Sequence, residues 1–118
     1  MSLAFYNVIH IVGIIMLFLG IGGAVVRSFL AQDSSSLEKF VLINHGTGLM
    51  LILFAGFGQL AKLGMPFDGW VIIKIIIWLF LGSLITLIKK KPDLKNVWWY
   101  GALIMGGFAT YLGVYKPF

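Results

Sequence analysis

Four long runs of apolar residues constrain this chain more than any other feature of its sequence. They cover residues 3–26, 40–61, 70–88 and 97–115, and the third contains one charged residue, Lys74. A helix that crosses a bilayer needs roughly 20 residues at about 1.5 Å per residue, which is the length of each run. The runs do not alternate polar and apolar residues, so transmembrane β-strands are excluded. The sequence therefore predicts an all-α integral membrane protein with four transmembrane helices.

The composition agrees with this fold class. Only 11% of the 118 residues are charged, against about 25% in soluble domains, and the mean hydropathy is +1.01. A water-soluble globule is therefore excluded. Short connecting segments at residues 31–38, 63–69 and 89–96 favour antiparallel neighbours, so we expect one domain over residues 1–118, folded as an antiparallel four-helix bundle. We expect Asp33 or Ser36 to cap the second helix, and Pro92 to stop the third.

Positive charge is distributed unevenly among the segments outside the apolar runs. The segments between the first and second runs and between the third and fourth runs hold six basic residues, and the other side holds two. The six are Arg27, Lys39, Lys89, Lys90, Lys91 and Lys95, and the two are Lys62 and Lys116. Because basic residues accumulate on the cytoplasmic side, we predict a multi-pass protein of the bacterial inner membrane with both termini outside the cytoplasm. The net charge of +5 is thus assigned to membrane orientation and lipid contact, with no nucleic-acid partner. The first run lacks a basic leading region and exceeds a signal-peptide core in length, so we expect it to be retained.

The lack of cysteine and the positions of the acidic residues limit the kinds of metal and catalytic site that the chain can form. The chain has no cysteine, which excludes disulfides, thiolate metal sites and cysteine nucleophiles. The four acidic residues all fall in expected loops, so a carboxylate metal cluster is not expected. Aromatic residues near the ends of the runs are expected to form an interfacial belt. They are Tyr6, Trp70, Trp98, Trp99, Tyr100 and Tyr115.

Three ionisable side chains lie inside the predicted spans: His10, His45 and Lys74. Such residues are costly in lipid, so each is a candidate functional residue. Counted from the span centres, His10 and Lys74 lie at one level, about 7 Å toward the outside, and His45 lies about 15 Å from that level. Two axial ligands of one haem iron lie only about 4 Å apart. His10 and His45 are therefore not expected to share one iron.

Residues at 3–4 spacing form one stripe on each of the first two helices. The stripes are His10, Gly13, Leu17, Gly20, Ala24 and Arg27 on the first helix, and His45, Gly48, Ile52, Ala55, Gln59 and Lys62 on the second. Both combine small and polar residues, so we expect both to face other helices. Gln59 and Tyr111 are expected at the level of His10 and Lys74. The glycines are expected mainly to pack helices, the alternative being that some leave room for a flat cofactor.

Each candidate residue also has a structural alternative. His10 either ligates haem iron or is a packing histidine that hydrogen-bonds across helices. Lys74 binds a porphyrin propionate or a substrate, ligates iron, or extends its ammonium to the membrane surface. His45 either ligates a second haem iron or contacts Asn44 or Arg27.

Three features in order resemble a known family. They are His10 in a first span closed by Arg27, the segment 69–74 (GWVIIK), and the segment 116–118 (KPF). The pattern resembles the HemJ-type membrane protoporphyrinogen oxidases and the related CopD-like and SirB-like four-helix membrane proteins. The resemblance implies haem b as cofactor and a porphyrin as substrate, with His10 and Lys74 as the residues linked to haem binding and activity.

The chain also departs from that family pattern. Residues 96–107 (NVWWYGALIMGG) lack the Asn-Glu-x-Pro element with which the family's fourth span begins, and His45 stands near a proline of the family's second span. The functional hypothesis is therefore haem-linked redox chemistry, as either six-electron oxidation of protoporphyrinogen or electron transfer. The catalytic candidates are His10 and Lys74, and His45, Gln59 and Tyr111 join them as cofactor-binding candidates. Two alternatives stand beside it: a cofactor-free structural or accessory subunit of a larger membrane complex, and a small permease acting as a homo-oligomer.

Overall fold

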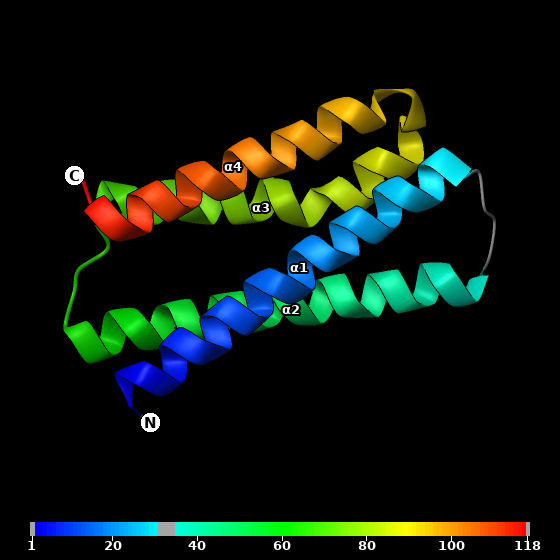
Figure 1. The fold of residues 1–118 in the computed structure, drawn as a ribbon. Coiled ribbons are helices and arrows are strands. Elements are labelled where there is room, and N and C mark those ends of the chain that lie inside the picture. Colours follow the sequence, from blue (N-terminus) through cyan, green and yellow to red (C-terminus); the bar gives the residue numbers. More distant parts are fainter. Residues whose placement is uncertain (1, 31–34, 118) are drawn as a thin grey trace. The chain divides into compact units, whose positions relative to one another are not determined.

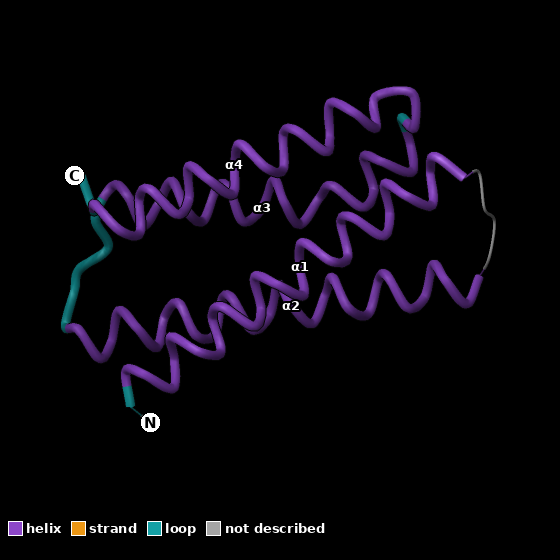
Figure 2. Tube along the Cα trace, in the orientation of Figure 1, coloured by secondary structure: helices purple, strands orange, loops and turns teal. Residues whose placement is uncertain are grey.

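The computed structural model describes residues 2–30 and 35–117, and within these ranges the chain is helical with no strand. The helices are α1 (Leu3–Leu30), α2 (Ser35–Leu63), α3 (Gly69–Lys90) and α4 (Lys95–Tyr115), with one short 3-10 turn, η1 (Pro92–Leu94), before α4. Figures 1 and 2 show these elements along the chain. The prediction of an all-α chain with four long helices is confirmed.

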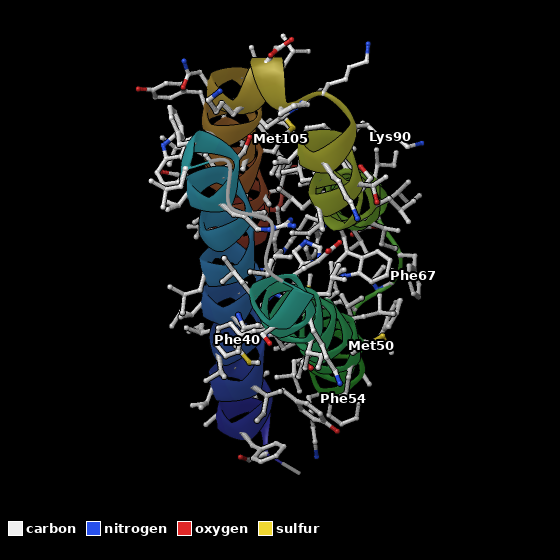
Figure 3. The ribbon with its side chains drawn as sticks, turned by 90° about the vertical axis from the view of Figure 1, so that its right-hand side faces the viewer. Phe40, Met50, Phe54, Phe67, Lys90 and Met105 are labelled. Carbon is white, nitrogen blue, oxygen red and sulfur yellow. The ribbon has the colours of Figure 1, made fainter. Side chains whose placement is uncertain are left out.

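All four helices are long and apolar enough to cross a membrane, as expected for a multi-pass membrane protein. Large apolar side chains on them are exposed in great number, and Phe40, Met50 and Phe54 project from α2 in this way (Figure 3). Soluble monomers rarely expose apolar surface on this scale. In the hydrocarbon core of a bilayer, exposing apolar side chains carries no unfavourable solvation free energy.

The helices extend beyond the apolar runs that predicted them. α2 begins at Ser35, five residues before the predicted span starts at Phe40, because a helix continues into the polar zone outside the hydrocarbon. Glu38 then lies in the first turn of α2, where a negative charge interacts favourably with the helix dipole. Ser36 is the second residue of the helix, so the prediction that it caps α2 is wrong. The alternative cap, Asp33, lies outside the described residues.

Proline ends α3 as predicted. Lys91 is the last residue before Pro92, and its backbone N–H bonds to the Leu87 carbonyl. Pro92 then opens η1, because its ring cannot continue the preceding helix. The Trp98 indole Nε1 donates a hydrogen bond to the Lys91 carbonyl at 3.2 Å, which ties the turn to the start of α4.

The chain divides into two compact units, and α1 contributes to both. The first unit combines residues 1–20 with residues 34–66, so it pairs the N-terminal part of α1 with α2. The two helices are antiparallel, since Gly13 lies against Gly48 and Gly20 lies against His45. A β-carbon at Gly48 would lie 2.7 Å from the Gly13 carbonyl oxygen. Glycine at both positions is therefore what lets the two backbones approach this closely.

The second unit combines residues 21–33 with residues 67–118. In it α3 and α4 run antiparallel and side by side (Figure 1). The C-terminal turns of α1 belong to the same unit, where Gly22 lies 3.8 Å from the Trp99 ring, measured from its ideal β-carbon. The Lys95 ammonium lies 4.9 Å from the centre of the Phe29 ring. The buried side chains of α3 are Trp70, Val71, Ile77, Leu81, Leu84 and Ile88, and the last four follow 3-4 spacing.

Burial agrees with the two predicted stripes. On α1 the residues Gly13, Leu17, Gly20 and Ala24 are buried, and on α2 the residues His45, Gly48 and Ala55 are buried. His10 and Arg27 at the ends of the first stripe are half-buried, and Lys62 at the end of the second is exposed. The prediction that these faces pack inside the protein is confirmed, because 3-4 spacing places their residues on one side of each helix.

Candidate functional site

His10 faces α2 from the second turn of α1 and is half-buried. Its Nδ1 lies 3.1 Å from the carbonyl oxygen of Ile52. A carbonyl oxygen only accepts hydrogen bonds, so Nδ1 carries the proton and donates. In a neutral imidazole, Nε2 then holds the unshared electron pair. The contact with α2 therefore selects the tautomer in which Nε2 is the donor atom toward a metal.

Glycine lines the α2 side of this ring. A β-carbon at Gly56 would lie 3.5 Å from His10 Cε1, an ordinary contact distance. The Tyr6 ring, one turn before His10, lies directly over Gly58, and its centre is 5.8 Å from that of Phe54. The ring of His10 thus lies against one turn of α2, with Nδ1 bonded to the Ile52 carbonyl and Cε1 beside Gly56. The aromatic side chains of Tyr6 and Phe54 lie one turn away.

A second polar contact lies close to His10. The Gln59 side chain donates a hydrogen bond from Nε2 to Asn7 Oδ1 at 2.7 Å. Asn7 precedes His10 by three residues and Gln59 follows Gly56 by three, so both lie one turn from the imidazole. The structure thus brings the two predicted residues His10 and Gln59 together at one end of the first unit. Asn7 was not predicted, although a lone amide within an apolar run was a signal for it.

His45 lies at a different level of the same helix pair. It is 4% exposed, and a β-carbon at Gly20 would lie 2.9 Å from His45 Cβ. Ten residues of α1 separate Gly20 from His10, which corresponds to about 15 Å along the helix. The two histidines are therefore too far apart along α1 to be axial ligands of one iron. The neighbouring Asn44 donates from Nδ2 to the Met16 carbonyl at 2.7 Å.

Lys74 belongs to the second unit and is half-buried between α3 and α4. Its ammonium lies 3.1 Å from the position that a β-carbon of Gly113 would occupy. The Lys116 ammonium approaches the same glycine and donates to the Gly113 carbonyl at 2.8 Å. It also lies 5.6 Å from the centre of the Trp70 ring. Trp70 is the second residue of α3, near the end of its span as predicted, and its side chain is buried.

Tyr111 lies on an exposed row of aromatic rings along α4. Its ring centre is 6.3 Å from that of Phe108 and 4.9 Å from that of Tyr115. Gly113 follows Tyr111 by two residues, about 200° around the helix, so the two point to nearly opposite sides of α4. Tyr111 thus lies away from the Lys74 ammonium within the second unit.

The candidate residues are therefore divided between the two units. His10, Gln59 and His45 belong to the first, and Lys74 and Tyr111 belong to the second. A common level for His10 and Lys74 stays a prediction. Within residues 2–30 and 35–117 no group of three or more His, Cys, Asp or Glu side chains is placed to hold a metal ion. A metal at His10 would therefore need to bring most of its own ligands, as the iron of a porphyrin does.

Comparison of the chain with models of known protein families, with curated proteins and with solved structures finds no match.

Proposed function

We propose that this protein binds haem b through His10 and acts in haem-linked redox chemistry. The observation that carries the proposal is the hydrogen bond from His10 Nδ1 to the Ile52 carbonyl at 3.1 Å. Histidines that ligate metals almost always donate their other ring N–H to a carbonyl, a carboxylate or water. That bond orients the ring, selects the tautomer and makes Nε2 a better electron-pair donor.

The surroundings of His10 fit a porphyrin ligand. Gly56 adds no side chain beside the ring, and the aromatic side chains of Tyr6 and Phe54 lie one turn away. Asn7 and Gln59 supply amide groups that are able to hydrogen-bond a polar edge of the ligand. When bound, haem supplies one-electron oxidation and reduction at its iron. The net reaction is either the six-electron oxidation of protoporphyrinogen or the transfer of electrons between partners.

The roles predicted for Lys74 and His45 are kept as parts of this proposal. A porphyrin carboxylate beside Lys74 requires that the second unit bring this lysine to the level of His10. A second haem iron at His45 is separated from the first by about 15 Å along α1. The haem content per chain distinguishes one site from two.

We further propose that the helices form an antiparallel four-helix bundle in a bacterial inner membrane, with both termini outside the cytoplasm. The antiparallel pairing of α1 with α2 and of α3 with α4 supports the bundle. The six basic residues between the first and second runs and between the third and fourth runs, against two on the other side, support the orientation.

The second candidate function is a cofactor-free structural subunit of a larger membrane complex. The close contact between Gly13 and Gly48 is compatible with it, because such glycine contacts pack membrane helices without any cofactor. In that case the bond from His10 to Ile52 would serve packing alone. A third candidate function is a homo-oligomeric permease. Co-purification with other proteins at a fixed stoichiometry would support the structural subunit over the permease.

The deciding experiment is a reduced-minus-oxidised visible spectrum of the detergent-purified chain, with haem quantified per chain. A b-type signal near one haem per chain supports the His10 site. His10→Ala should then lose the haem while the protein still inserts. The matched control is Asn44→Ala, which removes a hydrogen bond between the same two helices, to Met16, and should keep the haem. A wild-type protein without haem after expression with ample haem, or a His10→Ala variant with full haem, would overturn the proposal.

A further inference from the structure

Two lysine ammonium groups converge on one glycine at the end of the second unit where α3 begins and α4 ends. The Lys116 ammonium lies 2.8 Å from the Gly113 carbonyl oxygen. The Lys74 ammonium lies 3.1 Å from the position of a Gly113 β-carbon. Lys74 is half-buried and Lys116 is exposed, and like charges at this separation repel. A fold that holds both ammonium groups at one residue is therefore suited to an anion.

The backbone at the end of α4 directs Lys116 to this place. Lys116 caps the helix in the left-handed conformation, with φ 48° and ψ 58°, and its N–H bonds to the Leu112 carbonyl. It is the one non-glycine residue with positive φ among those the structure describes. This turn carries the side chain back over α4 and above the Trp70 ring, at 5.6 Å from the ring centre. A left-handed conformation is uncommon for a residue with a β-carbon.

The opposite helix contributes the second lysine and the floor of the site. Trp70 and Lys74 are four residues apart on α3, so their side chains lie on one face. Trp70 is buried, and Gly113 leaves the space that the Lys74 ammonium approaches. The site thus consists of two cations, an aromatic floor and a glycine backbone.

Among residues 21–30 and 67–117 of the same unit, no ion pair joins Lys74 or Lys116 to an acidic side chain. Over residues 67–117 the acidic side chains are Asp68 and Asp93, and Asp93 lies in η1, at the far end of α3 and α4. Asp68 precedes α3 at its N-cap position, and within this range no ion pair joins it to Lys74 or Lys116. The positive end of the α3 dipole adds to the same potential.

We propose that Lys74 and Lys116 form a site for one phosphate group at the membrane surface, supplied by an anionic phospholipid headgroup or by free phosphate. Basic pockets between transmembrane helices bind lipid headgroups on the cytoplasmic side of membranes, and the same chemistry is proposed here for the opposite surface. The ends of two apolar helices are also where headgroups are most concentrated. Every residue in the site belongs to the second unit. Lys74 is also the residue proposed above for a porphyrin carboxylate, so the test below measures phosphate binding without reference to haem.

The test uses the full chain in nanodiscs of phosphatidylcholine with phosphatidylglycerol, and native mass spectrometry counts the phosphatidylglycerol retained after extraction into detergent. The wild type should retain one phosphatidylglycerol per chain. The double variant K74M/K116M should bind it about thirtyfold more weakly, through the loss of two lysine contacts. The control K90M/K91M removes two exposed lysines from the other end of α3 and should leave retention unchanged.

A second pair of variants tests the shape of the site while keeping every charge. Gly113→Leu fills the space beside the Lys74 ammonium and should weaken retention, whereas Gly107→Leu places its side chain where nothing lies within 4 Å and should not. Unchanged helicity by circular dichroism shows that both variants fold. Retention that survives Gly113→Leu, or that falls equally in K90M/K91M, would mean attraction by charge alone and would overturn the proposal.

A second measurement distinguishes a phospholipid headgroup from free phosphate as the ligand. Phosphorus NMR of inorganic phosphate, added to lipid-free protein in a non-ionic detergent, should show broadening that K74M/K116M abolishes if free phosphate is the ligand. Retained phosphatidylglycerol without such broadening assigns the site to the lipid headgroup. Absence of both signals in the wild type overturns the site altogether.

Discussion

The backbones of Gly13 and Gly48 are in contact, and a β-carbon on either residue would clash with the carbonyl oxygen of the other. A β-carbon at Gly13 would lie 2.9 Å from the Gly48 carbonyl oxygen, and one at Gly48 would lie 2.7 Å from the Gly13 carbonyl oxygen and from the Leu17 nitrogen. All of these neighbours are backbone atoms, which cannot rotate away as a flexible side chain can. The contact therefore determines how closely α1 and α2 approach.

Gly48→Ala should accordingly destabilise the protein. We expect a loss of about 1–3 kcal/mol, because the two helices must separate to admit the methyl group. Chemical unfolding of the detergent-solubilised protein, followed by circular dichroism, measures the change. Gly46→Ala on the same helix is the control, since nothing lies within 4 Å of its β-carbon position and alanine favours helix. Equal stability of the two variants would show that the contact does not limit helix approach.

Asn44→Leu should weaken the same helix pair through a lost hydrogen bond. The Asn44 amide donates to the Met16 carbonyl at 2.7 Å. Hydrogen bonds between membrane helices contribute about 0.6 kcal/mol on average and at most about 1.7 kcal/mol. The same unfolding measurement should therefore show a loss of about 1 kcal/mol. Thr47→Leu, at an exposed position one turn along α2, should show none.

Asn7 and Gln59 should be energetically coupled. Their side chains share one hydrogen bond of 2.7 Å between α1 and α2. In a double-mutant cycle built from Asn7→Ala and Gln59→Ala, the double variant should lose about 0.6 kcal/mol less than the sum of the single losses. Strict additivity would indicate that the bond does not form in the membrane.

The orientation predicted from the basic residues can be tested with single cysteines, since the natural chain has none. Pro66→Cys and Lys91→Cys are both exposed and lie in different connections. A membrane-impermeant thiol reagent added to intact cells should label Pro66→Cys. Lys91→Cys should react only after the inner membrane is opened, because positive charge remains on the cytoplasmic side. The reverse pattern would place both termini in the cytoplasm.

Much of the helical architecture could be predicted from the sequence, because it depends on local properties. The apolar runs are long enough to span a bilayer, and 3-4 spacing put Leu17 and Ala55 on buried faces before any contact was known. The exact helix ends were less predictable. α2 includes charged residues such as Glu38, which hydropathy assigns to a loop although a helix tolerates them outside the hydrocarbon.

Several contacts of the candidate site could not be predicted from the positions of residues within one helix. The positions of His10, His45 and Lys74 in the apolar runs are enough to identify them as ionisable residues within apolar helices. Two contacts could not be predicted in this way: the Ile52 carbonyl faces His10 Nδ1, and Lys116 joins Lys74 at Gly113. The first depends on the register of α2 against α1, and the second on the left-handed turn that ends α4. Both arise from pairings between distant segments, which the spacing of residues within one helix does not specify.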